Sequence, residues 1–245
     1  MLFRSGHIWI GGSSTNGGST NWNGLTVGNG FATSGKNLGS FGKRGATGLN
    51  WEAGVFLDEA TLNSGGGNIY IAGKRNSSGT HGSGVINYSG NGTLIDAGSG
   101  TIEIKGQSSE TPTYFDWGVM TGLNPGDYSG QFVLKSSNTT AANAISVSGI
   151  TAGDGDGILI ENVTRILSTA TANGGGISIS GSSGSRSALS VGIGANFGTL
   201  EALSASGDIT VDVGSKPLLV ASQGIFRVGS VSGDAAVASS AANVT

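Results

Sequence analysis

Short runs in which aliphatic and variable residues alternate recur along the chain. The clearest run is Ile69–Gly73, where two isoleucines flank one variable residue and are followed by a small residue and a glycine. Related runs begin at Ile8, Ile102, Ile145, Ile177 and Ile209. Alternation with a period of two places the aliphatic side chains on one face of a β-strand. Each run therefore predicts a short strand.

The spacing of these runs indicates a repeat architecture. From Ile69 onward, the first isoleucines are separated by 33, 43, 32 and 32 residues, a range typical of repeat folds. A second series, in which a small residue or proline precedes an aliphatic one, contains Val55, Val85, Val119, Ile158, Leu189 and Leu218. Each coil could contain a third strand, anchored in the core by Leu62, Leu94, Leu167 or Leu200. We predict an all-β fold, a parallel β-helix with coils of about 30 residues; a β-propeller or a β-sandwich accounts less well for these spacings.

Stacked coils would place the repeated aliphatic residues in two columns inside the tube. This predicted core ladder consists of Ile69, Ile71, Ile102, Ile104, Ile145, Val147, Ile177, Ile179, Ile209 and Val211. Full burial of one aliphatic side chain contributes roughly 1.5–3 kcal/mol, so the ladder is expected to hold much of the stability. A glycine follows the inward pair at a fixed offset at Gly73, Gly106, Gly149 and Gly181. These glycines indicate corners where the backbone needs a positive φ or a close approach.

Composition and charge limit the classes of protein and partner. Charged residues make up 11% of the chain and hydrophobic ones 36%, so it lacks both the charge of disordered segments and the long apolar runs of membrane spans. We expect no stable membrane insertion. The net charge of -3 and the lack of long Lys/Arg runs argue against nucleic acid as a partner. The chain has no cysteine, which excludes disulfides and thiolate metal sites.

The repeats extend from end to end without a linker, which predicts one domain. We expect a single β-helical domain over residues 1–245, with less regular coils in 1–53 and about six coils in 54–245. Because Ile8–Ile10 already forms a predicted strand, the residues before it are too few for a signal peptide. The chain is therefore expected to be a piece of a longer precursor.

The repeats resemble the large exoproteins of the filamentous haemagglutinin type, which Gram-negative bacteria secrete by the two-partner route. The likeness rests on Ile8–Gly12 with Asn21–Gly28, on Ala60–Ile69 and on Ile95–Ile102. It implies a right-handed parallel β-helix, an extracellular or cell-surface location, and contact with an outer-membrane transporter during secretion. Such exoproteins carry a secretion domain with an Asn-Pro-Asn-Gly type motif, and the nearest string here, Asn124–Gly126, lies far inside the chain. The segment therefore resembles the shaft of an exoprotein.

The strongest candidate for a metal site is the acidic segment Gly153–Gly157. The carboxylates of Asp154, Asp156 and Glu161 are oxygen ligands of the kind that calcium prefers, and the alternating glycines permit a sharp turn. Calcium-binding repeats occur in tandem, whereas this segment stands alone. A turn between strands is therefore the simpler interpretation. We expect no cofactor unless these three residues gather around calcium.

Aromatic residues are the candidates for contact with sugars. Sugar rings could stack on Trp9, Trp22, Trp51 and Trp117, but packing in a cap or core is the simpler interpretation because three of them lie in the first 53 residues. No two acids stack at the outward strand positions predicted for neighbouring coils, and His7 and His81 offer no catalytic arrangement. We therefore expect no enzymatic activity.

These features together predict a structural or adhesive shaft of an extracellular exoprotein. Its expected partners are other coils of the same exoprotein, further copies of the chain, and a glycan or protein receptor on a host or other surface. Open coil ends would let the copies assemble into fibres. The alternative is a carbohydrate-binding or polysaccharide-cleaving β-helix that uses the tryptophans and the acidic segment.

Overall fold

The computed structural model describes the part of the chain that carries the repeats. The described residues are 6–11, 19–22, 25–28, 36–39, 51–75, 81–88, 92–108, 116–122, 130–172, 174–192, 197–231 and 236–239. They contain strands and turns and no helix. The strands are β1 (Ile8–Ile10), β2 (Ser19–Trp22), β3 (Leu25–Gly28), β4 (Lys36–Gly39), β5 (Trp51–Asp58), β6 (Thr61–Asn63), β7 (Ile69–Lys74), β8 (His81–Tyr88), β9 (Thr93–Asp96), β10 (Ile102–Gln107), β11 (Asp116–Thr121), β12 (Gln131–Ser136), β13 (Asn143–Thr151), β14 (Ile158–Ile160), β15 (Val163–Ser168), β16 (Gly176–Ser183), β17 (Leu189–Val191), β18 (Gly198–Ser204), β19 (Ile209–Asp212), β20 (Leu218–Val220), β21 (Gly224–Ser230) and β22 (Ala236–Ser239).

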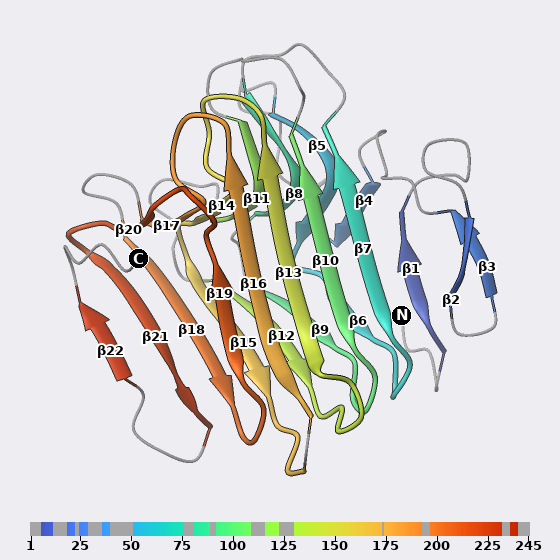
Figure 1. Ribbon diagram of the computed structural model, residues 1–245. Coiled ribbons are helices and arrows are strands. Elements are labelled where there is room, and N and C mark those ends of the chain that lie inside the picture. The colour runs from blue at the N-terminus through green and yellow to red at the C-terminus, as the bar shows by residue number, and fades with distance from the viewer. Residues whose placement is uncertain are drawn as a thin grey trace.

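The strands form three long sheets, because each coil contributes one strand to each sheet (Figure 1). Sheet 1 has the order β1-β7-β10-β13-β16-β19, sheet 2 the order β20-β17-β14-β11-β8-β5-β4, and sheet 3 the order β22-β21-β18-β15-β12-β9-β6. Strands from successive coils pair in parallel, for example β7 with β10 and β10 with β13. This arrangement confirms the predicted all-β parallel β-helix.

The predicted core ladder runs along the inner face of sheet 1. Its members are in register from one coil to the next, so that Ile102 pairs with both Ile69 and Ile145, and the columns continue to β19. The eight members in β7, β10, β13 and β16 are at most 6% exposed. Ile209 and Val211, in the last strand of the sheet, are partly buried and pack against the same core. The ladder therefore loses burial only where no described strand follows it.

The second predicted series forms the matching inner column of sheet 2. Val55 pairs with Val85, and the register continues through Val119, Ile158 and Leu189 to Leu218. All six side chains are at most 2% exposed. Sheets 1 and 2 thus face each other across an aliphatic interior.

Sheet 3 supplies the third strand of each coil, but two of its four predicted anchors are wrong. Leu62 and Leu200 do pack in the core. Leu94 is 37% exposed and Leu167 is half-buried, because the buried residues beside them are Ile95 and Ile166. In a strand, a shift of one residue transfers a side chain to the opposite face.

Glycines allow the backbones of sheets 1 and 2 to touch along one line. Gly73, Gly106, Gly149 and Gly181 are in register in sheet 1, and Gly84, Gly118, Gly157 and Ala188 precede the buried series of sheet 2. A Cβ atom on Gly106 would overlap the carbonyl of Gly118, and one on Gly149 would overlap the carbonyl of Gly157. We call this contact the glycine seam. The sheet 1 glycines of the seam lie within strands and have no positive φ, so close approach, and not a corner, selects glycine here.

Beyond the glycine seam, the interior becomes polar. The positions two residues after the sheet 1 glycines hold Arg75, Ser108, Thr151 and Ser183, which are all buried. The Arg75 guanidinium forms an ion pair with the buried carboxylate of Asp116, and the Ser108 hydroxyl donates to Thr151 Oγ1 at 2.6 Å. The seam therefore separates an aliphatic compartment from a polar one.

Antiparallel strands occur at two places in the described part of the chain. β22 pairs antiparallel with β21, and β2 pairs antiparallel with β3. β22 is the last described strand of sheet 3, and no described strand pairs with the outer edge of β19, β20 or β22. Assembly of copies through open coil ends stays a prediction.

Candidate functional site

The fold does not gather the three predicted calcium ligands. Asp154 and Asp156 lie in the turn before β14, whereas Glu161 follows that strand at its other end. Asp154 Oδ1 accepts a hydrogen bond from Ser185 Oγ at 2.8 Å, and Asp156 Oδ1 accepts one from the Ser187 backbone nitrogen at 3.2 Å. Across the described residues, no group of three or more His, Cys, Asp or Glu side chains is placed to hold a metal ion.

The acidic segment holds the corresponding loop of the next coil. Ser185 Oγ also lies 3.1 Å from the carbonyl oxygen of Gly153, and Ser183 Oγ donates to the carbonyl of Gly155 at 2.7 Å. The backbone nitrogen of Gly157 donates to the carbonyl of Ser187 at 3.0 Å. Each of these bonds links residues 153–157 to residues 183–187. The segment acts as a turn that fixes its neighbour, as the simpler interpretation predicted.

A groove of about 630 Å³ opens beside this fixed loop, on the outer face of sheet 2. Three of its polar lining residues, Asp156, Ser187 and Ser190, are at most 3% exposed. Its more accessible lining includes Arg186, Lys216, Pro217, Leu219, Val220 and Ala221. A cavity of this size, with apolar walls and a few buried polar groups, has the properties of a small-molecule site. It is the candidate functional site of the chain.

The groove begins where a column of apolar side chains on the outer face of sheet 2 is interrupted. Phe56, Ile86, Met120 and Leu159 are in register and at most 3% exposed. The next residue in register is Ser190, followed by Leu219, which is 46% exposed. The column is thus covered over β5, β8, β11 and β14 and open over β20. Sequence reasoning missed Ser187, Ser190, Lys216 and Leu219; the change from apolar residues to Ser190 in this column is the signal that could have found them.

Burial dominates the electrostatics of the Asp156 carboxyl. It raises the pKa of Asp156 above the ordinary value of 3.8, and it outweighs the hydrogen bond from the Ser187 backbone, the positive charge of Arg186 and the hydrogen bonds from the Ser190 and Ser187 hydroxyls, which all lower the pKa. Desolvation disfavours the charged form of a carboxyl group. The ionised carboxylate in the groove is therefore costly, even with several donors around it.

The raised pKa of Asp156 predicts a pH-dependent contribution to stability. The native state holds the proton to a higher pH than the unfolded chain does, so this contribution is complete below the ordinary value of 3.8 and is lost as the pH rises through the folded pKa. Asp156→Asn, which cannot ionise, should therefore gain in free energy of unfolding relative to the natural chain as the pH rises from about 3 to about 7. Urea unfolding at stepped pH measures this difference.

Asp154→Asn is the matched control for this titration, because Asp154 is an exposed carboxyl in the same turn. A difference between the natural chain and Asp156→Asn that stays constant over the whole pH range would contradict the prediction.

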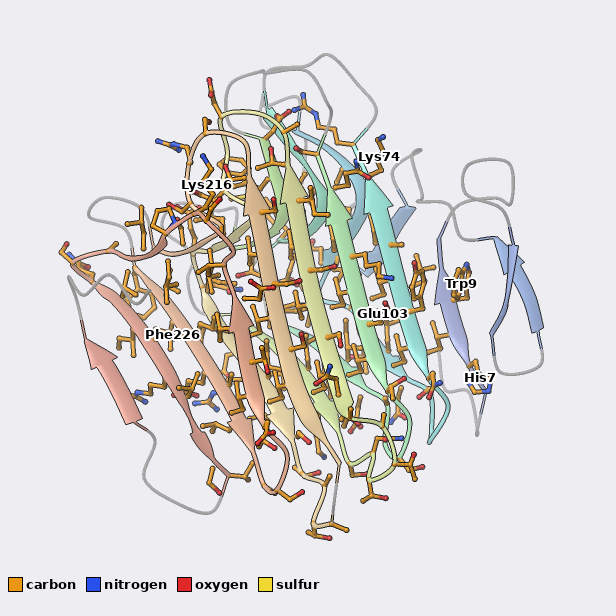
Figure 2. The ribbon with its side chains drawn as sticks, viewed as in Figure 1. His7, Trp9, Lys74, Glu103, Lys216 and Phe226 are labelled. Atoms are coloured by element: carbon orange, nitrogen blue, oxygen red, sulfur yellow. The ribbon has the colours of Figure 1, made fainter. Side chains whose placement is uncertain are left out.

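The two tryptophans with described side chains, Trp9 and Trp117, pack against other aromatic residues. The Trp9 ring stacks on Tyr70 with centroids 3.9 Å apart and planes 7° apart (Figure 2 shows Trp9 on β1). The ammonium of Lys105 lies 5.5 Å from the centroid of Tyr70. Trp117 is 4% exposed and belongs to a buried cluster with Phe56 and its neighbours in the column. The side chains of Trp22 and Trp51 lie outside the described residues.

Most outward positions of sheet 1 from β13 to β19 are polar and aligned by the register, and Ile150 is an exposed apolar exception. Ser146, Ser178 and Thr210 form one outward column, and Ser148, Ser180 and Asp212 form the next. Glu103 and Lys105, on the coil nearer the N-terminus, form an ion pair at 2.6 Å with both side chains about 40% exposed. Burial lowers the pKa of Lys105, but its hydrogen bond to Glu103 and the charges of Glu103 and Tyr70 raise it more, so the net shift is upward. These charges satisfy each other and form no acid pair.

Sheet 3 carries an ion-pair column that sequence reasoning also missed. Glu201 lies in register between Arg165 and Arg227. Its two carboxylate oxygens lie 2.8 Å from Arg165 Nε and 2.8 Å from an Arg227 guanidinium nitrogen. The Glu201 side chain is only 11% exposed. The arrangement links three successive coils across their outer face.

No family model, curated protein or solved structure matches the chain. Within the described ranges, no helix is long and apolar enough to cross a membrane. A functional proposal must therefore rest on the coils, their outer faces and the groove.

Proposed function

We propose that the chain is the structural shaft of a secreted or surface-exposed bacterial exoprotein, without enzymatic activity of its own. The observation that carries the proposal is the continuous register of two aliphatic columns through β7, β10, β13, β16 and β19. In such a solenoid each coil contacts only its neighbours, so the length of the rod follows the number of coils. The likeness of the repeats to exoproteins of the filamentous haemagglutinin type supports the same reading.

The placement of the charged side chains also supports a structural function. Glu103 is paired with Lys105, and Glu201 is paired with two arginines. Asp154 and Asp156 hold the loop of the next coil. These carboxylates therefore hold neighbouring residues and coils in place.

Removal of one complete coil tests whether the chain acts as a modular shaft. Deletion of Ile158–Ala188 joins Gly157 to Leu189, which is the residue in register with Ile158. The strands β17, β18 and β19 would then pair with β11, β12 and β13 through equivalent positions. We expect a shorter rod that keeps its β-sheet circular dichroism and cooperative unfolding, and loses one coil rise of about 4.8 Å in length. Small-angle scattering and urea unfolding measure these properties.

A half-coil deletion is the control for this experiment. Deletion of residues 158–172 removes β14 and β15 but keeps β16, so the next strands would meet the wrong sheets. We expect this variant not to fold. If both deletions unfold the chain equally, the coils are not interchangeable and the shaft proposal is wrong.

Surface exposure needs a separate test in the bacterium that makes the protein. We expect an added protease to digest the protein on intact cells, or an antibody to find it in the culture medium. A periplasmic enzyme that resists the protease is the internal control. Protection of the chain equal to that of the control would contradict a surface location.

A further inference from the structure

We propose that the groove beside β17 and β20 binds an acidic saccharide, such as an oligosaccharide of uronic acids. This site goes beyond the shaft, which needs no ligand. The groove offers three chemically different surfaces: a buried polar part, an apolar wall and two cations. The ligand must match all three.

The buried polar residues of the groove indicate a ligand with hydrogen-bond donors. Asp156, Ser187 and Ser190 are each at most 3% exposed, and all three line the groove. The loop fixes them, because the Ser187 backbone donates to Asp156 Oδ1 at 3.2 Å. An ionised carboxylate only accepts hydrogen bonds, whereas a hydroxyl can donate or accept. The Ser187 and Ser190 hydroxyls already donate to Asp156, so this group can offer a ligand only acceptor sites, on the carboxylate and on the serine oxygens. Neighbouring sugar hydroxyls can donate to these oxygens.

The positively charged side chains of Lys216 and Arg186 indicate that the same ligand carries a negative charge. Lys216 Nζ donates to the carbonyl of Gly184 at 2.9 Å, which uses one of the three donors of an ammonium and fixes its position. Arg186 carries a second positive charge close enough to lower the pKa of Asp156. Figure 2 shows Lys216 well away from Trp9, toward the C-terminal side of the molecule. A simple anion would match these cations but would meet repulsion from Asp156, whereas a uronic acid also carries hydroxyl donors.

The apolar wall matches the C–H face of a sugar ring. Pro217 and Leu219 are exposed, and Val220 and Ala221 are half-buried, along the same groove. Leu219 continues a column whose earlier members are covered. A ligand that covers Leu219 buries apolar surface in the same groove that Lys216, Arg186 and Asp156 line. Ligand sites commonly combine apolar walls with a few placed polar groups, and a sugar ring, with C–H faces and hydroxyl edges, matches both.

Isothermal titration of the whole chain with trigalacturonate tests the proposal. We expect saturable binding that weakens about tenfold or more when the carboxyl groups of the trisaccharide are reduced to alcohols, because a charge-assisted contact is lost. Lys216→Gln and Leu219→Ser should each weaken the binding of trigalacturonate by about fivefold to tenfold. Lys135→Gln, on the outer face of sheet 3, should leave it unchanged. Circular dichroism confirms that each variant is folded.

Several results would overturn the proposal. These are no heat of binding at millimolar trigalacturonate, equal affinity for the reduced trisaccharide, or unchanged affinity of both groove variants. Displacement of trigalacturonate by an equal concentration of inorganic phosphate would mark the groove as a site for simple anions instead. None of these outcomes affects the coil-deletion test, so the failure of this site and the failure of the shaft can be told apart.

Discussion

Gly149→Ala is expected to lower the free energy of unfolding by about 3 kcal/mol or more, although it adds a single methyl group. The new Cβ atom would overlap the carbonyl oxygen and carbon of Gly157 on sheet 2. These backbone atoms belong to a residue that is hydrogen-bonded to Val119 and Ser187 of the neighbouring coils, and they cannot rotate away as a side chain could. The sheets must separate locally, which disturbs the aliphatic packing beside the glycine seam. Urea unfolding monitored by circular dichroism measures the loss.

Ser148→Ala is the matched control for the glycine seam. Ser148 precedes Gly149 in β13, but its side chain is on the outer face of sheet 1 and half-buried. We expect a change of at most about 0.5 kcal/mol. Similar stability of the two variants would show that the sheets can move apart without cost, and the seam would then have no structural importance.

Ile145→Ala should be similarly severe, with a loss of about 4 kcal/mol. Ile145 has no exposed surface and lies in register between Ile102 and Ile177. Its truncation leaves a cavity between coils that are held in place by their own backbone pairing, so the space cannot easily close. The free energy of unfolding is the quantity to measure.

Ile209→Ala provides the comparison within the same column. Ile209 is chemically identical, but it is only partly buried in the last strand of sheet 1. We expect a loss of about 1–2 kcal/mol, because less apolar surface returns to water. If Ile209→Ala costs as much as Ile145→Ala, further chain or another molecule covers the end of sheet 1 in solution.

The aliphatic columns could be predicted because the fold repeats one local pattern. A period of two fixes which face each side chain takes, and equal spacing then brings Ile102 and Ile145 together in neighbouring coils. The same reasoning succeeded for the Val55 series. It failed for Leu94 and Leu167. Each has an aliphatic neighbour in its strand, so the alternation does not show which of the two residues faces the core. There the exposed or half-buried partner could not be told from the buried one.

The groove could be predicted only in part, because its residues come from three different coils. The sequence does indicate Asp156, as an acid in a glycine-rich turn, but it suggests a calcium ligand together with Asp154 and Glu161. In the structure, Glu161 lies away from this turn, and the pairing of the coils places Ser190 and Leu219 in the same groove as Asp156. Which outward positions are covered depends on segments far from them in sequence. A pattern within one strand does not contain that information.

The pairing of each coil with its neighbours alone also determines how such a rod would respond to mechanical load. When it is pulled along its axis, the terminal coil can detach while the coils behind it keep their own hydrogen bonds. A coil with the 32-residue spacing seen between Ile145 and Ile177 would release roughly 100 Å of extended chain. A rod built this way would lengthen in steps under tension and absorb energy at every step, so a brief strong force would not have to break it.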